Sequence, residues 1–151
     1  MSQDHSALEA RIDQLESRDA IANLQYDYAH GCDNRDADRF MAIWHDDATY
    51  DLHNDFGSNT GHGEIRDVLG KIWDAYTESH HWMTNIVTKF QNADHSTTEA
   101  DCVCIVRGPG GFEIISATYL NLNERRDGVW RIARCDLTVQ WSHVLHLTLN
   151  E

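Results

Sequence analysis

The feature that most constrains the fold is a change of hydrophobic period about halfway along the chain. Before about residue 78, apolar residues such as Ile21, Leu24 and Tyr28 recur three or four positions apart, which is the spacing of an amphipathic helix. After that point, apolar and polar residues alternate in long runs joined by the turn sequences NADHS, GPGG and RRDG. Helices that all precede a series of hairpin-linked strands are typical of an α+β fold.

The predicted elements fill residues 1–151 as a single domain. We expect N-terminal helices over about 6–48, with Gly31 a plausible end or break of the first and Asp36 a cap for the second. A brief strand at TYDL and a glycine-rich turn at GSNTGHG lead to a helix over about 63–78. The four long strands of a meander over about 81–141 are predicted at His81–Phe90, Thr97–Arg107, Phe112–Asn123 and Val129–Trp141.

The short turns predict a curved antiparallel sheet in the form of a half-open cone, with the N-terminal helices covering one face. A pocket inside the cone is the expected consequence of this arrangement. Alternation along the strands, together with the end of the preceding helix, indicates which residues would contact a substrate there. These are Ile72, Tyr76, Cys102, Cys104, Ile115 and Tyr119.

The second long strand is apolar on both faces. Cys102 and Cys104 share one face, and Val103 and Ile105 share the other. A strand that is apolar on both sides is covered on both sides, so one face meets a helix or a cavity and the other meets a partner subunit. The sequence therefore predicts a homo-oligomer, either a dimer or a trimer.

Charge and composition exclude several classes of partner. Twelve basic residues against 25 acidic ones give a net charge of −13, which disfavours binding to nucleic acid. The polar N-terminus has no apolar signal core, and no run approaches the ~20 apolar residues that span a bilayer. We therefore expect a cytoplasmic protein without a membrane partner. The four cysteines lack C-x-x-C spacing, which favours reduced core thiols.

The sequence contains no convincing cofactor or metal motif. GPGG lacks the lysine and the following helix of a phosphate-binding loop and is interpreted as a hairpin turn. His143 and His146 have a metal-compatible spacing on a helix, but no third ligand is evident. The pair Asp46 and Asp47 is expected in a solvated turn between a helix and a strand. We therefore predict neither a cofactor nor a metal.

Four stretches of the chain carry a family resemblance: YAHGCDNRD, FMAIWHDDATYDL, SHHWMTN and ERRDGVWRI. Their order resembles the SnoaL-like branch of the nuclear-transport-factor-like, cystatin-type cone superfamily, from about Arg18 to Trp141. Within that branch the chain is most similar to lindane dehydrochlorinase, bile-acid dehydratase and scytalone dehydratase. This superfamily hosts many unrelated activities, so the resemblance implies the fold more directly than the function.

The resemblance implies a catalytic pair of Asp33 and His81, with Tyr28 beside them. Tyr28 matches a tyrosine of the bile-acid enzyme, whereas the dehydrochlorinase has a lysine there, so Tyr28 favours loss of water over loss of halide. Tyr50 matches an aromatic residue that faces the pocket in these enzymes. His80 is expected on the opposite strand face from His81.

Two positions depart from the related enzymes. An additional acidic residue of the bile-acid enzyme falls at Cys104, and a pocket arginine of the dehydrochlorinase falls at or beside Cys135. Arg134 is one residue away, so we expect its side chain to face the other side of the strand.

The leading hypothesis is a cofactor-independent lyase, a dehydratase or dehydrohalogenase-like enzyme, that acts on a hydrophobic cyclic small molecule. Histidine is suited to general-base work because its charge changes near neutral pH, and a carboxylate on its other nitrogen sets the tautomer. One alternative is a ketosteroid-isomerase-like proton shuttle in which Asp33 is the base. Another is a noncatalytic binding or assembly subunit, in which His81 and Asp33 are only structural.

Overall fold

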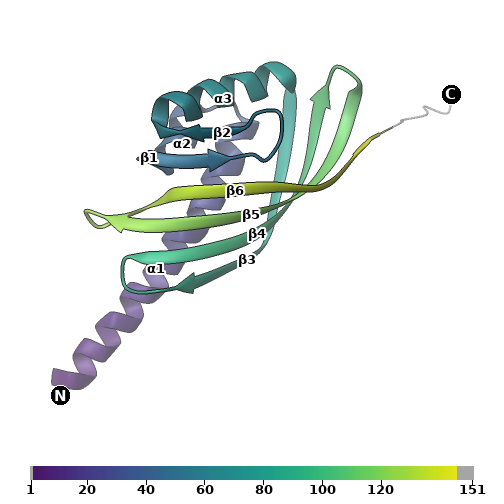
Figure 1. The fold of residues 1–151 in the computed structure, drawn as a ribbon. Helices are drawn as coiled ribbons and strands as arrows, with labels where there is room; N and C mark the ends of the chain where they lie inside the picture. Colours follow the sequence, from purple (N-terminus) through teal and green to yellow (C-terminus); the bar gives the residue numbers. More distant parts are fainter. Residues whose placement is uncertain (1, 146–151) are drawn as a thin grey trace.

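The fold combines three helices with a six-stranded sheet in the part of the chain that the computed structural model describes, residues 2–145 (Figure 1). In chain order the elements are α1 (Ser2–Asp33), α2 (Ala37–Ala42), β1 (Trp44–Asp51), β2 (Ser58–Thr60), α3 (Gly61–Ala75), β3 (Glu78–Phe90), β4 (His95–Gly108), β5 (Gly111–Arg126) and β6 (Val129–Val144). The predicted α+β order, with helices before a strand meander, is confirmed.

The sheet is mixed rather than wholly antiparallel. Its strand order is β2-β1-β6-β5-β4-β3, and β3 to β6 form the predicted antiparallel meander. β1 pairs with β6 in parallel, and β2 pairs with β1 antiparallel. Parallel neighbours need a long crossover connection, which α3 and the first three strands of the meander provide here.

β1 begins earlier than the sequence predicts. The helical pattern of DADRFMAIWHDDA ends at Ala42, and Trp44 already belongs to β1. The cause is tertiary pairing, because the Ile132 amide of β6 donates to the Ile43 carbonyl at 2.8 Å. Asp46 and Asp47 are exposed as predicted, but they lie in β1 and not in a turn. Three residues of the predicted glycine-rich turn form β2.

Gly31 does not interrupt α1, which continues to Asp33. A Cβ atom at Gly31 would lie only 2.8 Å from the backbone nitrogen and Cβ of Phe40. Glycine is required here because α2 packs directly against the last turn of α1. This close packing fixes the last turn of α1, which carries Asp33, against α2.

The helices cover one face of the curved sheet, and the N-terminal turns of α1 project past it (Figure 1). Ile21, Leu24 and Tyr28 of α1 are buried, whereas Leu8 and Ile12 on the projecting part are exposed. None of the helices in residues 2–145 is long and apolar enough to cross a membrane.

Candidate active site

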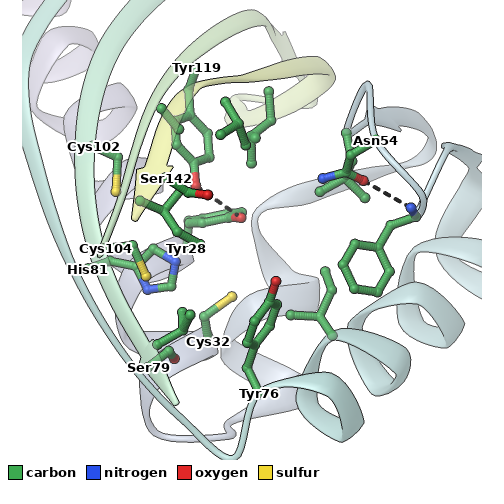
Figure 2. A pocket seen from close by; sticks show the side chains of 18 of the residues that line it. Tyr28, Cys32, Asn54, Tyr76, Ser79, His81, Cys102, Cys104, Tyr119 and Ser142 are labelled. Atoms are coloured by element: carbon green, nitrogen blue, oxygen red, sulfur yellow. Dashed lines mark hydrogen bonds between the residues drawn. The ribbon is translucent and has the colours of Figure 1, made fainter. Parts of the chain in front are cut away.

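A cavity of about 190 Å³ lies between the inner face of the sheet and the C-terminal ends of α1 and α3. Figure 2 shows His81, Cys102, Cys104 and Tyr119 directed into it from the sheet, with Tyr76 opposite them. Every residue that the sequence proposed for substrate contact lies in its wall. These are Tyr50, Ile72, Tyr76, Cys102, Cys104, Ile115 and Tyr119.

Asp33 and His81 form a tight pair at the junction of α1 and β3. The Nδ1 atom of His81 lies 2.6 Å from Oδ1 of Asp33, and the His81 amide donates to Oδ2 at 2.9 Å. The Ser79 hydroxyl also donates to Oδ1, at 2.8 Å. Only 11% of each of the two side chains, Asp33 and His81, is exposed. An ionised carboxylate can only accept, so Nδ1 carries the proton and Nε2 is free to accept one.

Burial acts to raise the pKa of the Asp33 carboxyl, but the hydrogen bonds from His81 and Ser79 outweigh it and hold the pKa below its ordinary value. Asp33 is therefore a stable anion at neutral pH. It does not line the cavity. It borders a separate surface hollow behind His81, together with residues that include His30 and His80.

Three tyrosines meet at one end of the cavity. The Tyr28 hydroxyl lies 2.6 Å from the Tyr50 hydroxyl, and the Tyr119 hydroxyl donates to Tyr28 at 3.4 Å. The Tyr28 ring also stands edge-to-face with the His81 ring, with centroids 5.9 Å apart. Burial raises the pKa of all three phenols, so they remain neutral hydrogen-bond donors. The arrangement supplies donors next to a histidine that can accept a proton.

Three thiols also face the cavity. Cys32, Cys102 and Cys104 are free and buried. Burial raises the pKa of Cys102 to about 12 and raises those of Cys32 and Cys104 as well. Because the thiolate is the reactive form, these cysteines act as apolar wall and not as nucleophiles.

Several cavity residues were not predicted. Ser79 and Glu113 lie two positions before His81 and Ile115, on the same strand faces, so alternation alone could have identified them. Asn54 belongs to the loop after β1, where its side chain accepts from the Phe56 amide at 2.9 Å (Figure 2). No sequence signal places that loop, because its position depends on how β1 joins β6.

Of the positions that depart from the related enzymes, Cys104 lies in the cavity wall, whereas Arg134 and Cys135 lie outside it. Arg134 turns away and pairs with Asp136 at 2.6 Å, whereas Cys135 is buried in the core.

His80 is exposed on the outer face, as its position predicted. His143 lies in β6 rather than on a helix, and His146 is outside the described residues.

In the part of the chain that the structure describes, one group of potential metal ligands lies on the surface, where Asp51, His53 and Asp136 come within reach of one another. The Arg134 guanidinium lies 2.6 Å from Asp136 and 3.7 Å from Asp51. Arginine thus supplies the positive charge between these carboxylates, and the group is an ion-pair network.

Comparisons with protein families and with known proteins point to the same family. A model of the SnoaL-like domain matches residues 13–136. Hexachlorocyclohexane dehydrochlorinase 1 of Sphingobium indicum is 34% identical over 126 residues, which cover 82% of this chain and 81% of that protein.

Among solved structures, a type 2 hexachlorocyclohexane dehydrochlorinase superposes with a TM-score of 0.87 at 30% identity, covering 93% of this chain and 97% of that one. A putative scytalone dehydratase from Novosphingobium aromaticivorans gives a TM-score of 0.80 at 20% identity, covering 91% and 93% of the two chains. The second likeness concerns the fold alone.

Proposed function

The chain belongs to the SnoaL-like domain family, and on that premise we propose that it is a cofactor-independent lyase that forms an alkene by elimination from a hydrophobic cyclic small molecule. The observation that carries this proposal is the pair of His81 and Asp33, 2.6 Å apart, with His81 in the wall of an apolar cavity. The dehydrochlorinases similar to this chain are named for an elimination of the same class.

In the proposed reaction, Nε2 of His81 removes a proton from the carbon next to the one that bears the leaving group. The electrons of that C–H bond form the new double bond, and the leaving group departs with its own bonding pair. Asp33 stabilises the imidazolium that results and keeps Nδ1 protonated throughout. If the leaving group is hydroxide, it takes a proton from the imidazolium and departs as water, which returns His81 to its neutral form.

The three phenols favour water over halide as the leaving group. Departing oxygen needs a hydrogen-bond or proton donor, and the hydroxyl groups of Tyr28, Tyr50 and Tyr119 are neutral donors beside His81. Among the described residues, no lysine or arginine lines the cavity to stabilise a departing chloride ion. Dehydrochlorination is the second candidate, because the relative at 34% identity is named for it.

The two alternative functions receive less support. A ketosteroid-isomerase-like mechanism needs the Asp33 carboxylate in the cavity, but its oxygens accept from His81 and Ser79 and it lies behind the cavity wall. A noncatalytic binding subunit has no need for a histidine held in one tautomer next to three phenols. The geometry therefore favours His81 as the base.

The test is a panel of cyclic β-hydroxy ketones, hydroxy-steroids and halogenated cyclohexanes, assayed for alkene formation. The cavity is below the ~300–1,000 Å³ usual for drug-sized ligands. One- or two-ring substrates should therefore react and steroids should not. If only the halogenated compounds gave an alkene, the leaving group would be halide and not water. If no member of the panel gave an alkene, the lyase proposal would be contradicted. The same assay with a chelator present checks that turnover needs no metal.

A further inference from the structure

A second hollow opens directly outside the cavity, at the hairpin between β4 and β5. We call it the outer hollow, and it shares two residues with the cavity, Tyr76 and Glu113. Its remaining border consists of Ala75, Gly108, Pro109, Gly110, Gly111 and Val144. Tyr76 and Glu113 thus stand at the passage from the cavity to the surface, where an extended ligand would cross.

Glu113 brings charge to a cavity that otherwise has little. Among the described residues that line the cavity and the outer hollow, it is the only Asp, Glu, Lys or Arg. Antiparallel pairing with Val106 and Val144 holds its backbone in the sheet. Neither a lysine nor an arginine of residues 5–145 forms an ion pair with it. Burial raises the pKa of the Tyr76 phenol, and the nearby Glu113 carboxylate raises it further.

The GPGG hairpin leaves space at this passage. A Cβ atom added at Gly110 or Gly111 would meet nothing within 4 Å, and Gly111 has a φ of +107° that favours glycine. A Cβ atom added at Gly108 would instead lie 3.6 Å from the nearest atoms of the Tyr76 ring. The turn therefore borders the outer hollow largely with backbone, which leaves room for a ligand substituent next to the Glu113 carboxylate.

We propose that Glu113 and Tyr76 form an outer subsite that accepts a hydrogen-bond-donating, non-anionic substituent, a hydroxyl or an ammonium group, on a ligand whose ring occupies the cavity. A carboxylate accepts hydrogen bonds and donates none, so it binds donors and repels anions. The repulsion is strengthened because Glu113 is partly buried among mainly apolar residues. This inference deepens the proposed function by excluding carboxylate and phosphate substrates, and it rests on the cavity being the substrate site.

The experiment measures binding and not turnover. Isothermal titration calorimetry at neutral pH compares three probes that share a naphthalene ring: 2-naphthalenemethanol, 2-naphthylmethylammonium and 2-naphthoate. Each is titrated into the wild-type protein, Glu113→Gln and Glu99→Gln. Glu99 is exposed on β4 outside the cavity, so its substitution makes the same change of net charge as a matched control.

The wild-type protein should bind the alcohol and the ammonium more tightly than the carboxylate. Glu113→Gln should weaken the ammonium and strengthen the carboxylate by about tenfold each, the size expected of one charge interaction of ~1.4 kcal/mol. Glu99→Gln should leave all three affinities within about twofold, as expected of a distant surface charge screened by solvent. Glu113→Asp, which keeps the charge, should retain the wild-type order of affinities, and thermal melting verifies that each variant is folded.

Three outcomes would overturn the subsite: equal effects of Glu113→Gln and Glu99→Gln, naphthoate binding as tightly as the ammonium in the wild-type protein, or no binding of either donor probe. If the donor preference holds while the elimination panel yields no alkene, the proposed lyase function fails and the subsite stands. The two proposals can therefore fail separately.

Discussion

The inner and outer faces of the β3 to β6 meander are built from alternate residues of the same strands, yet their side chains differ in kind. The inner face carries His81, Cys104 and Tyr119, which are at least partly buried and line the cavity. On the outer face, Trp82 and Trp141 are 45% and 53% exposed. The direction of a side chain in this sheet therefore decides whether it lines the cavity, and neighbours in sequence can lie in entirely different surroundings.

The outer face has its own organisation. Trp82 is opposite Val103, Val103 is opposite Ser116, and Ser116 is opposite Trp141, so these residues form one row across four strands. Three of its four members, Trp82, Val103 and Trp141, are exposed apolar side chains, and exposed apolar side chains gathered on one face mark interaction sites. The row is where we place the contact of the predicted homo-oligomer, which remains a prediction.

The largest loss of turnover should come from substituting His81 on the inner face. His81→Ala removes the proposed base and should lower turnover by ~10²–10⁴-fold, the usual contribution of general-base catalysis. His95→Ala is the matched control, because His95 is an exposed histidine at the start of β4 that lies outside the cavity, and its turnover should stay close to wild type. Rate measurements on the substrate from the elimination panel decide this. Full activity in His81→Ala would end the proposed mechanism.

Asp33→Asn should have the next largest effect. An amide cannot stabilise the imidazolium and can hold the wrong tautomer of His81, so we expect a loss of turnover of about 10²-fold or more. The relative size of the two losses separates the mechanisms. If Asp33→Asn reduced turnover far more than His81→Ala, the isomerase-like mechanism with Asp33 as base would be favoured instead.

Tyr28→Phe should lower turnover by about tenfold, which corresponds to one hydrogen bond of ~1.4 kcal/mol. The loss is smaller than for His81→Ala because the hydroxyl groups of Tyr50 and Tyr119 remain near the same point. Tyr26→Phe is the matched control, since Tyr26 lies on the same helix but is 45% exposed. Equal rates for the two variants would remove Tyr28 from the proposed machinery.

The pKa of Asp33 predicts a pH-dependent difference in stability. Because the folded-state pKa is lowered, the ionised carboxylate stabilises the fold at pH values above the ordinary carboxyl pKa of about 4. That stabilisation is lost as the pH falls through the lowered value. The melting temperature of the wild-type protein should therefore exceed that of Asp33→Asn near neutral pH, and the gap should narrow below about pH 4. Exposed Asp74→Asn serves as the control, and a gap that widens in acid would contradict the prediction.

The smallest effect on turnover is expected from the outer face. Trp82→Ser combined with Trp141→Ser should shift the mass in light scattering toward the 17.3 kDa of one chain, because an interface that buries well over ~1,000 Å² would lose its centre. Turnover should change by less than about twofold if the two faces are independent, an amount equivalent to ~0.4 kcal/mol. A wild-type protein that is already monomeric at micromolar concentration would refute the predicted oligomer.

The sequence alone determined much of the inner face. The change of period predicted the helices and the meander, and the resemblance placed Asp33, His81 and Tyr28 at the ends of elements that meet. Alternation assigned Cys102 and Cys104 to the face that lines the cavity. These predictions depend on local periodicity and on short turns, which the residues themselves encode.

Tertiary structure decided what strict alternation could not. β6 contains two register shifts, one between the partners of Leu122 and Asn123 and one between those of Ser116 and Ala117. Each inserts one residue into β6 and reverses the faces beyond it. The first buries Cys135 after Ile132 and turns Arg134 outward, and the second places Ser142 in the cavity with Trp141 outside.

The same reason explains the remaining differences. The start of β1 at Trp44 and the loop that brings Asn54 to the cavity both depend on parallel pairing between β1 and β6. Those partners are more than 80 residues apart, as in the pair Tyr50 and Cys135. Hydrogen bonds between such distant segments leave no periodic signal in the sequence, so the bulges, the early start of β1 and the position of the Asn54 loop could be seen only in the assembled sheet.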